Sequence, residues 1–169
     1  MIYAIIKNGK YTGTTYEEIN DKILTHHTSQ GEVIIPVEVP PQPISFDDNG
    51  IPVYGEVDID TFKQGKLWQL ADARWREEIS GFTYNGHEFH SDRESQDRFF
   101  QAYMASLSDP SFTVTWKTKD GWLEMTASDF IALYNEFQTF LQGLYQKEKA
   151  LQEQVEAATT IEELNEVEW

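Results

Sequence analysis

The longest regular pattern of apolar positions lies in the last third of the chain. It follows a hairpin signal at 112–125, in which two apolar runs flank a Lys-Thr-Lys-Asp-Gly turn. Thr126 and Asp129 then have the spacing of a capping box, which predicts that a helix begins there. We expect this helix to contain about 30 residues and to be roughly 45 Å long at 1.5 Å per residue.

The apolar positions of this helix alternate between steps of four and three residues. They are Phe130, Tyr134, Phe137, Leu141, Leu144, Leu151 and Val155. Such spacing is the heptad of a coiled coil, broken here only at Glu148. It predicts a single apolar seam, and we call these seven residues the seam.

Shorter patterns precede this helix. An amphipathic face predicts a helix over 67–79, and alternating residues predict a hairpin that turns at Asn85-Gly86. A capping box at Ser91–Glu94 predicts the start of a second helix. With the hairpin and long helix that follow, residues 61–169 are predicted to form one C-terminal α+β module.

Residues 1–60 have a different character. A strand is predicted at 2–6, an Asn8-Gly9 turn after it, a short helix over about 15–24 and a second strand at 32–39. Proline then becomes dense, which favours an extended arm over a packed helix. The fold class is therefore predicted as α+β, with a small N-terminal β-rich unit, a proline-rich arm and the C-terminal module.

The first 60 residues are predicted to pack poorly against the module and to dock onto another chain. Short strands that cannot form a stable sheet alone suit strand addition to the sheet of a partner. The residues expected to make this contact are Ile2, Tyr3, Ile5, Ile34 and Val37.

The seam raises a second question, because the helix is longer than a compact domain of this size needs. Its first half is expected to fill the core of the module. Its second half needs either a partner helix or the first helix folded back. We predict an intermolecular bundle, in which Glu148 pairs with Lys147 or Lys149 of a neighbouring chain. The residues expected to make the oligomer are Phe137, Leu141, Leu144, Leu151 and Val155.

Composition narrows the possible partners. The 169 residues carry a formal charge of −16, which argues against binding to nucleic acid or to an anionic membrane surface. There is no Cys, which excludes disulfides and thiolate chemistry. No apolar run reaches the roughly 20 residues that span a bilayer, and the first six residues are too short for a signal-peptide core. We expect a protein that is made in the cytoplasm and does not insert into membranes.

No motif of catalysis or of cofactor binding is present. His26-His27 is expected in a polar loop, and His87 and His90 fall on opposite faces of a strand, so all four histidines are interpreted as surface residues without a metal. The acidic residues near 47–60 lack the spacing of a calcium loop. Carboxylate pairs of the glycosidase type stay open, because 29 acidic residues offer many pairs and their distances cannot be read from sequence. We predict no enzyme, no cofactor and no metal.

Several short motifs of the C-terminal module resemble those of a known family. They are Ala73-Arg-Trp-Arg76, Ile79, Gly81-Phe82, Tyr84-Asn-Gly-His-Glu-Phe89, Ser91-Asp92, Thr115-Trp-Lys-Thr118, Asp120-Gly121-Trp122, Met125-Thr126-Ala127, Tyr145-Gln-Lys-Glu-Lys149, Val155-Glu-Ala-Ala-Thr159 and Glu162-Glu163-Leu164. From about Leu67 to Trp169 the chain resembles a domain of unknown function (DUF4376-like) that is common in tailed-bacteriophage tail-fibre and fibre-assembly proteins. The resemblance supplies no catalytic residues.

The resemblance implies a phage tail context and leaves two functions open. The first is a structural adaptor or tail-fibre component of the virion, which docks through its N-terminal region and oligomerises through its C-terminal module, with a trimer favoured because phage fibres are trimeric. The second is a tail-fibre assembly chaperone that is absent from the mature virion. In both, the expected partners are other phage tail or tail-fibre proteins.

Overall fold

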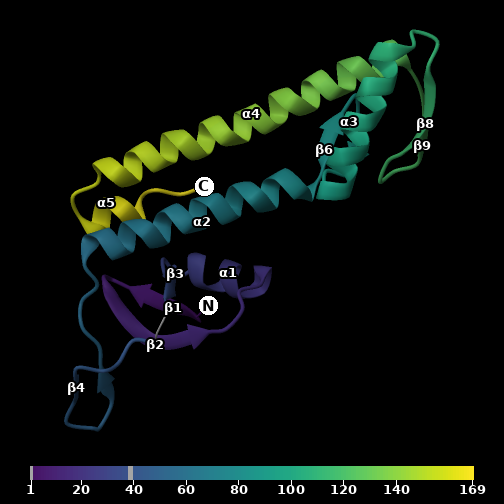
Figure 1. Ribbon diagram of the computed structural model, residues 1–169. Helices are drawn as coiled ribbons and strands as arrows, with labels where there is room; N and C mark the ends of the chain where they lie inside the picture. The colour runs from purple at the N-terminus through teal and green to yellow at the C-terminus, as the bar shows by residue number, and fades with distance from the viewer. Residues whose placement is uncertain (1, 38–39) are drawn as a thin grey trace. The chain divides into compact units, whose positions relative to one another are not determined.

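The computed structural model describes residues 2–37 and 40–169 and shows an α+β fold with antiparallel strands, as predicted (Figure 1). The chain forms two compact units. The first comprises Met1–Asp72 and Lys149–Trp169, and the second comprises Ala73–Glu148. The compact units therefore do not follow the predicted division at residue 60. Two helices, α2 (Ile59–Ser80) and α4 (Ala127–Ala157), contribute residues to both units.

A three-stranded antiparallel sheet forms the base of the first unit. Its strands are β1 (Ile2–Lys7), β2 (Lys10–Tyr16) and β3 (Val33–Val37), in the order β2-β1-β3. Asn8 and Gly9 both have positive φ, at 51° and 73°, which is the type I′ geometry predicted for this turn. The last two residues of the strand predicted at 32–39 lie outside the described residues.

The strand β2 takes the place of the first part of the helix predicted over 15–24. Its Tyr-Thr-Gly-Thr-Thr-Tyr stretch pairs with β1, and α1 (Asp21–Thr28) begins later. The side chain of Asn20 caps α1 by accepting a hydrogen bond from the backbone N–H of Ile23 at 3.0 Å. The prediction failed because β-branched residues next to a hairpin turn form strand readily even when few of them are apolar.

One core of the first unit joins segments that are far apart in sequence. It is formed by one face of the sheet, the first part of α2, the last turns of α4, and the helix α5 (Ile161–Asn165) with the chain that follows it. Its buried apolar residues are Ala4, Ile6, Val33, Ile35, Val57, Phe62, Leu70, Val155, Ala158, Leu164 and Val167. The prediction that residues 1–60 pack poorly against the rest of the chain is therefore wrong.

Gly65 allows α2 to approach the sheet closely. A Cβ atom at this position would lie 1.9 Å from Cγ2 of Ile35 and 3.2 Å from Cγ1 of Val33. Glycine is normally unfavourable inside a helix. Glycine is explained here by the close contact between α2 and β3, because any side chain at this position would push the two elements apart.

Histidine 27 is buried rather than exposed in a loop, which corrects the sequence-based interpretation. Its ring lies on α1 and is 6% exposed. Nδ1 lies 2.6 Å from Oε2 of Glu32 and Nε2 lies 2.9 Å from the hydroxyl of Tyr16, while Lys7 pairs with Glu32 at 3.0 Å. Because a carboxylate only accepts, Nδ1 donates to Glu32, while Nε2 and the Tyr16 hydroxyl share the second hydrogen bond. This chain of polar contacts joins α1 to β1, to β2 and to the residue that precedes β3.

These contacts predict a pH-dependent stability. The hydrogen bond from His27, followed by the bond and charge of Lys7, lowers the pKa of Glu32 below its ordinary value of 4.5, against the opposing effect of burial. The contribution of the carboxylate is therefore fully present above pH 4.5 and is lost as pH falls through the lower, folded-state pKa. We expect Glu32→Gln to lower the free energy of unfolding by about 1.5–3 kcal/mol at pH 7, and by much less near pH 3.

Urea denaturation at several pH values checks this expectation. Glu17→Gln, which changes an exposed carboxylate in the same unit, is the control and is expected to stay within about 0.5 kcal/mol of wild type. A loss for Glu32→Gln that is the same at pH 7 and pH 3 would contradict the assignment.

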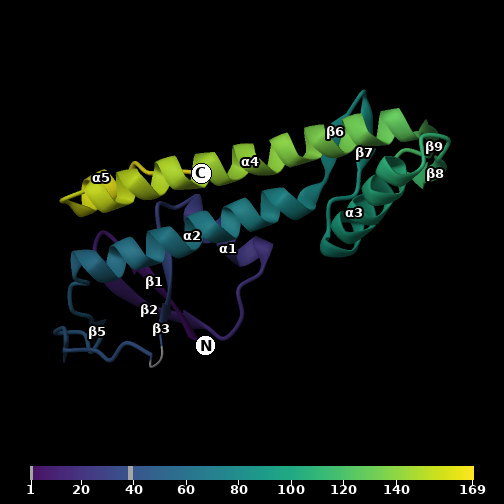
Figure 2. The same ribbon diagram turned by 45° about the horizontal axis from the view of Figure 1, so that its top comes forward.

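The proline-rich arm contains a short hairpin of two-residue strands, β4 (Ser45–Phe46) and β5 (Pro52–Val53). Asp47 organises the turn between these strands, since its side chain accepts from the backbone N–H groups of Asn49 and Ile51 at 2.9 and 2.8 Å. The hairpin forms its own two-stranded sheet. In both views it stands apart from the sheet β2-β1-β3 (Figures 1 and 2).

The second unit has the predicted order of elements. After α2 come β6 (Phe82–Tyr84) and β7 (His87–Phe89), then α3 (Arg93–Ser108), β8 (Thr113–Lys117) and β9 (Trp122–Thr126), and then α4. Both strand pairs are antiparallel hairpins. The core is mostly aromatic, and its buried residues are Phe82, Phe89, Phe99, Met125, Phe130, Leu133 and Phe137.

Of the two predicted capping boxes, the structure has the one at Thr126 and shifts the one at Ser91. The hydroxyl of Thr126 accepts from the N–H of Asp129 at 3.3 Å, while Asp129 accepts from the N–H of Thr126 at 3.1 Å. Thr160 forms a full capping box at α5. At α3 the cap is Asp92 rather than Ser91, because the Ser91 hydroxyl instead donates to the carbonyl of Glu78 at 2.6 Å.

None of the helices among the described residues combines the length and apolarity needed to cross a membrane.

Candidate functional site

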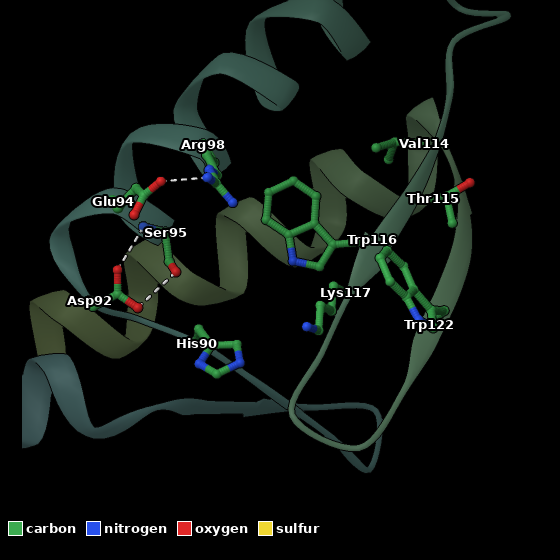
Figure 3. A pocket seen from close by; sticks show the side chains of 10 residues that line it. All are labelled: His90, Asp92, Glu94, Ser95, Arg98, Val114, Thr115, Trp116, Lys117 and Trp122. Atoms are coloured by element: carbon green, nitrogen blue, oxygen red, sulfur yellow. Dashed lines mark hydrogen bonds and ion pairs between the residues drawn. The ribbon is translucent and has the colours of Figure 1, made fainter.

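A candidate site is a hollow in the second unit, between the N-terminal part of α3 and the hairpin β8–β9 (Figure 3). Its volume is about 490 Å³, which is within the range of small-molecule sites. Charged, hydroxyl and aromatic side chains line it. They are His90, Asp92, Glu94, Ser95, Arg98, Val114, Thr115, Trp116, Lys117 and Trp122.

One wall of the hollow is rigid. The ring of Trp116 is stacked on Phe99, with centroids 5.1 Å apart and planes 6° apart, and its centroid is 5.0 Å from that of Phe130. Both phenylalanines belong to the aromatic core. The core therefore fixes the indole of Trp116 at the surface of the hollow.

A second tryptophan is held at the surface for no evident packing reason. Trp122 is 68% exposed, the second highest value among the large apolar side chains that are exposed. It is the cross-strand partner of Lys117, whose ammonium lies 5.9 Å from the centre of its ring. Exposing an indole of this size forgoes a large gain from burial. Trp122 thus presents a flat apolar surface at the rim of the hollow.

The acidic groups of the hollow already have donors. Asp92 accepts from the backbone N–H and the hydroxyl of Ser95 at 3.0 and 2.9 Å, and these bonds, the backbone one first, lower the pKa of Asp92. Glu94 accepts from Arg98, four residues later on α3. The dashed lines of Figure 3 mark these contacts. Both carboxylates are therefore engaged by donors of the chain itself.

The donors of the hollow are less fully engaged. Within the described part of the chain, neither Nε1–H of Trp116 nor the ammonium of Lys117 has an oxygen acceptor, and His90 makes no hydrogen bond. Arg98 keeps N–H groups beyond the pair with Glu94. The hollow therefore offers donors and a flat ring, while its acceptors are occupied.

Nothing in the described residues places three or more histidine, aspartate or glutamate side chains so that they could hold a metal ion. His87 is instead paired with Asp120, with Nδ1 and Oδ2 2.9 Å apart. This contact ties the hairpin β6–β7 to the turn of β8–β9.

The residues predicted to make the oligomer are placed in the interior of the chain. Phe137, Leu144 and Val155 are 1%, 6% and 0% exposed. Leu141 packs against the core of the second unit, and Leu151 packs against the core of the first. The chain fills the seam itself, so the prediction that other chains cover it is wrong. The alternative, in which the first helix folds back, is correct, because α2 and α4 each contribute residues to both units.

The prediction for Glu148 is corrected in the same way. It was expected to pair with a lysine of a neighbouring chain, but it is buried and its Oε2 lies 2.7 Å from Nε of Arg74 on α2. Arg74 also pairs with Glu78, whose side chain is 3% exposed, and its guanidinium lies 4.7 Å above the ring of Tyr145. The break in the heptad is therefore an internal ion-pair network.

The residues predicted to dock onto a partner are also largely covered. β1, which carries Ile2, Tyr3 and Ile5, is the central strand and has neighbours on both edges, so it cannot add to the sheet of another chain. Ile5 and Ile34 are paired across β1 and β3 and are both buried. The predicted docking through these two residues is wrong. Ile2, Tyr3 and Val37 are half-buried.

The motifs that carried the family resemblance have structural roles. Arg74 belongs to the buried network, and the ring of Trp75 lies 4.5 Å from the guanidinium of Arg93. Asn85 and Gly86 form a turn with positive φ at both positions. These motif residues therefore contribute to the fold of the second unit.

Two exposed apolar surfaces were missed from sequence. The first is the hairpin β4–β5, whose exposed side chains are Ile44, Phe46, Ile51 and Val53. The second, which we call the α3 stripe, consists of Phe100, Met104 and Leu107, each about half exposed. The i, i+4, i+7 spacing of the stripe was visible in the sequence, but α3 carries a second apolar row through Phe99, and periodicity alone does not say which row is buried.

The fold defines an α+β protein of two compact units. A family model described as a domain of unknown function (DUF4376) matches residues 62–168. Because the match covers more than half of the chain, the protein belongs to this family, and that part of the resemblance is confirmed. Searches of curated proteins and of solved structures each found no match. The family description carries no function, so the phage tail context stays a prediction.

Proposed function

We propose that this protein is a non-enzymatic component of a bacteriophage tail, made in the host cytoplasm and built into the virion. It attaches to another tail protein through the hairpin β4–β5 and associates with further copies of itself, with a trimer favoured, through the α3 stripe. The tail context rests on the resemblance of its C-terminal motifs. The assignment of surfaces rests on the exposure of large apolar side chains.

The exposure of large apolar side chains on the hairpin β4–β5 is the observation that supports the proposal most. Ile44 and Phe46 are 72% and 65% exposed, although they flank and form a strand. A two-stranded hairpin is at best marginally stable alone in water, and within residues 2–37 and 40–169 its outer edges have no strand neighbour. A partner that covers these side chains or extends the sheet would remove both liabilities.

The two strands of the hairpin are not equivalent. Pro52 has no N–H group, so β5 offers a weaker edge for strand addition than β4 does. The position opposite Pro52 is Phe46 on β4. We therefore assign β4 as the edge that pairs with the tail protein.

The α3 stripe supports self-association in place of the seam. Phe100, Met104 and Leu107 lie on one face of a regular helix and are left uncovered by the unit to which they belong. Contiguous exposed apolar side chains of this kind mark association surfaces. The C-terminal module therefore keeps its proposed role in self-association, but through the α3 stripe and not through the seam.

Two matched double variants separate the surfaces. Ile44→Ser with Phe46→Ser is expected to reduce attachment to tails at least tenfold, because it removes the apolar contact and leaves the rest of the chain unchanged. Phe100→Ser with Met104→Ser is expected to lower the oligomeric state while leaving the hairpin intact. Co-sedimentation with tails assembled without the protein measures the first effect, and light scattering measures the second.

Both variants change exposed side chains. The free energy of unfolding of each variant is therefore expected to differ from that of wild type by no more than about 0.5 kcal/mol per substitution. Tail attachment that survives in the hairpin variant would contradict the docking assignment. Wild-type protein that stays monomeric at tens of micromolar would contradict self-association through the stripe.

The second candidate is a chaperone of tail-fibre assembly, which would use the same exposed side chains transiently. The two functions differ in whether the chain remains in finished particles.

A further inference from the structure

We propose that the hollow between α3 and β8–β9 binds a saccharide unit that carries a carboxylate, of which a hexuronate is the simplest form. This site goes beyond the proposed role in the tail and does not depend on it. All of the side chains that form it belong to the second unit.

The ring of Trp122 supplies the apolar half of the recognition. Its exposed face lies at the rim of a hollow large enough for one or two sugar rings. The C–H groups on one face of a pyranose form a flat apolar surface that packs on an indole. The rest of the sugar is polar, which matches the mixture of aromatic, hydroxyl and charged side chains along the other walls (Figure 3).

The charge of the ligand follows from which polar groups of the hollow are already hydrogen-bonded within the chain. The carboxylates of Asp92 and Glu94 are already bonded within the chain, to Ser95 and Arg98. The ammonium of Lys117 and the indole N–H of Trp116 have no oxygen partner among the described residues. A ligand that brings acceptors, and one negative charge, satisfies the donors without displacing an existing bond.

The donors of the hollow are informative because the chain as a whole is strongly acidic. With a formal charge of −16, the protein repels anions over most of its surface. In the hollow, the positive charges of Arg98 and Lys117 balance the negative charges of Asp92 and Glu94, so one carboxylate meets less repulsion there than over the rest of the surface. Trp116 is also held in place by Phe99 and Phe130, so its N–H needs no reorganisation to donate.

The test uses the full chain and follows the indole N–H resonances by NMR during titration with sodium glucuronate, with glucose and sodium acetate as parallel probes. Glucuronate is expected to shift the resonances of Trp116 and Trp122 saturably, with a Kd on the order of 1 mM. Glucose, which lacks the charge, and acetate, which lacks the ring, are each expected to bind at least tenfold more weakly.

Variants identify the groups responsible. Lys117→Gln and Trp122→Ala alter exposed side chains and are each expected to weaken glucuronate binding at least tenfold with the fold intact. Lys22→Gln, which removes an exposed lysine of the first unit, is the control and is expected to leave binding unchanged. No saturable shift with glucuronate, an equal response to acetate, or unchanged binding in both variants would overturn the assignment.

Discussion

Replacing Arg74 with methionine is expected to lower the free energy of unfolding by about 3–5 kcal/mol, because it removes the cation nearest to two largely buried carboxylates. Arg74 pairs with Glu78 and Glu148, and the side chains of these residues are 3% and 12% exposed. The carboxylate of Glu78 would retain only the amide of Gln96, at 3.2 Å, and the more distant Arg93.

The pair between Glu94 and Arg98 offers a matched control. It is also an arginine–glutamate pair four residues apart on a helix, but its side chains are 65% and 75% exposed. Arg98→Met is expected to change stability by no more than about 0.5 kcal/mol. Urea denaturation of both variants at pH 7 makes the comparison. Equal effects of the two substitutions would show that the buried network contributes no more than a surface pair.

Val155→Asp is expected to unfold the first unit. Val155 is completely buried in the core that joins the sheet, α2 and α5. The substitution loses about 1.5–3 kcal/mol of apolar burial and places a carboxylate among buried apolar side chains, so a total loss of at least about 3 kcal/mol follows. Amide hydrogen exchange of β1 and β3, more than 100 residues away in sequence, is therefore expected to become fast.

The neighbouring residue supplies the control, because Gln154 is exposed on the same turn of α4. Gln154→Asp introduces the same charge and is expected to leave exchange in the sheet unchanged. An intermolecular seam gives the opposite result for Val155→Asp: smaller particles in light scattering, with protection of the sheet retained.

Local signals in the sequence were sufficient for most elements of the second unit. The turns at Asn85-Gly86 and the cap at Thr126 depend on residues that are adjacent along the chain, and their geometry is set by backbone preferences. The buried first half of the seam followed from the same reasoning, since two hairpins next to α4 need an apolar face on which to pack.

Long-range pairing could not be predicted in this way. Heptad spacing shows that Leu151 and Val155 need a partner surface, but it does not say whether that surface belongs to another chain or to residues 1–72. Buried polar residues add to the difficulty. His27 was interpreted as a surface residue, and Glu148 was expected to pair with a lysine of another chain, because the carboxylate and the cation that satisfy them lie on other elements.

The hollow was beyond sequence reasoning for a related reason. It combines residues 90–98 with 114–122, and its chemistry depends on which side chains are already hydrogen-bonded. The exposed position of Trp122 is likewise a property of the folded hairpin, since Trp116, six residues earlier, is stacked on the core. Composition showed five tryptophans but not which of them faces solvent.

The amount of this protein in purified, mature phage particles is the measurement that tests the proposed function most directly. Quantitative mass spectrometry of such particles, with the major tail-fibre protein as internal standard, distinguishes a part of the virion from a transient assembly factor. The proposed function predicts the chain at a stoichiometry comparable to that of the fibre. Its absence from finished particles, together with its presence in infected-cell extracts bound to unassembled fibre, would contradict the virion role and favour the chaperone.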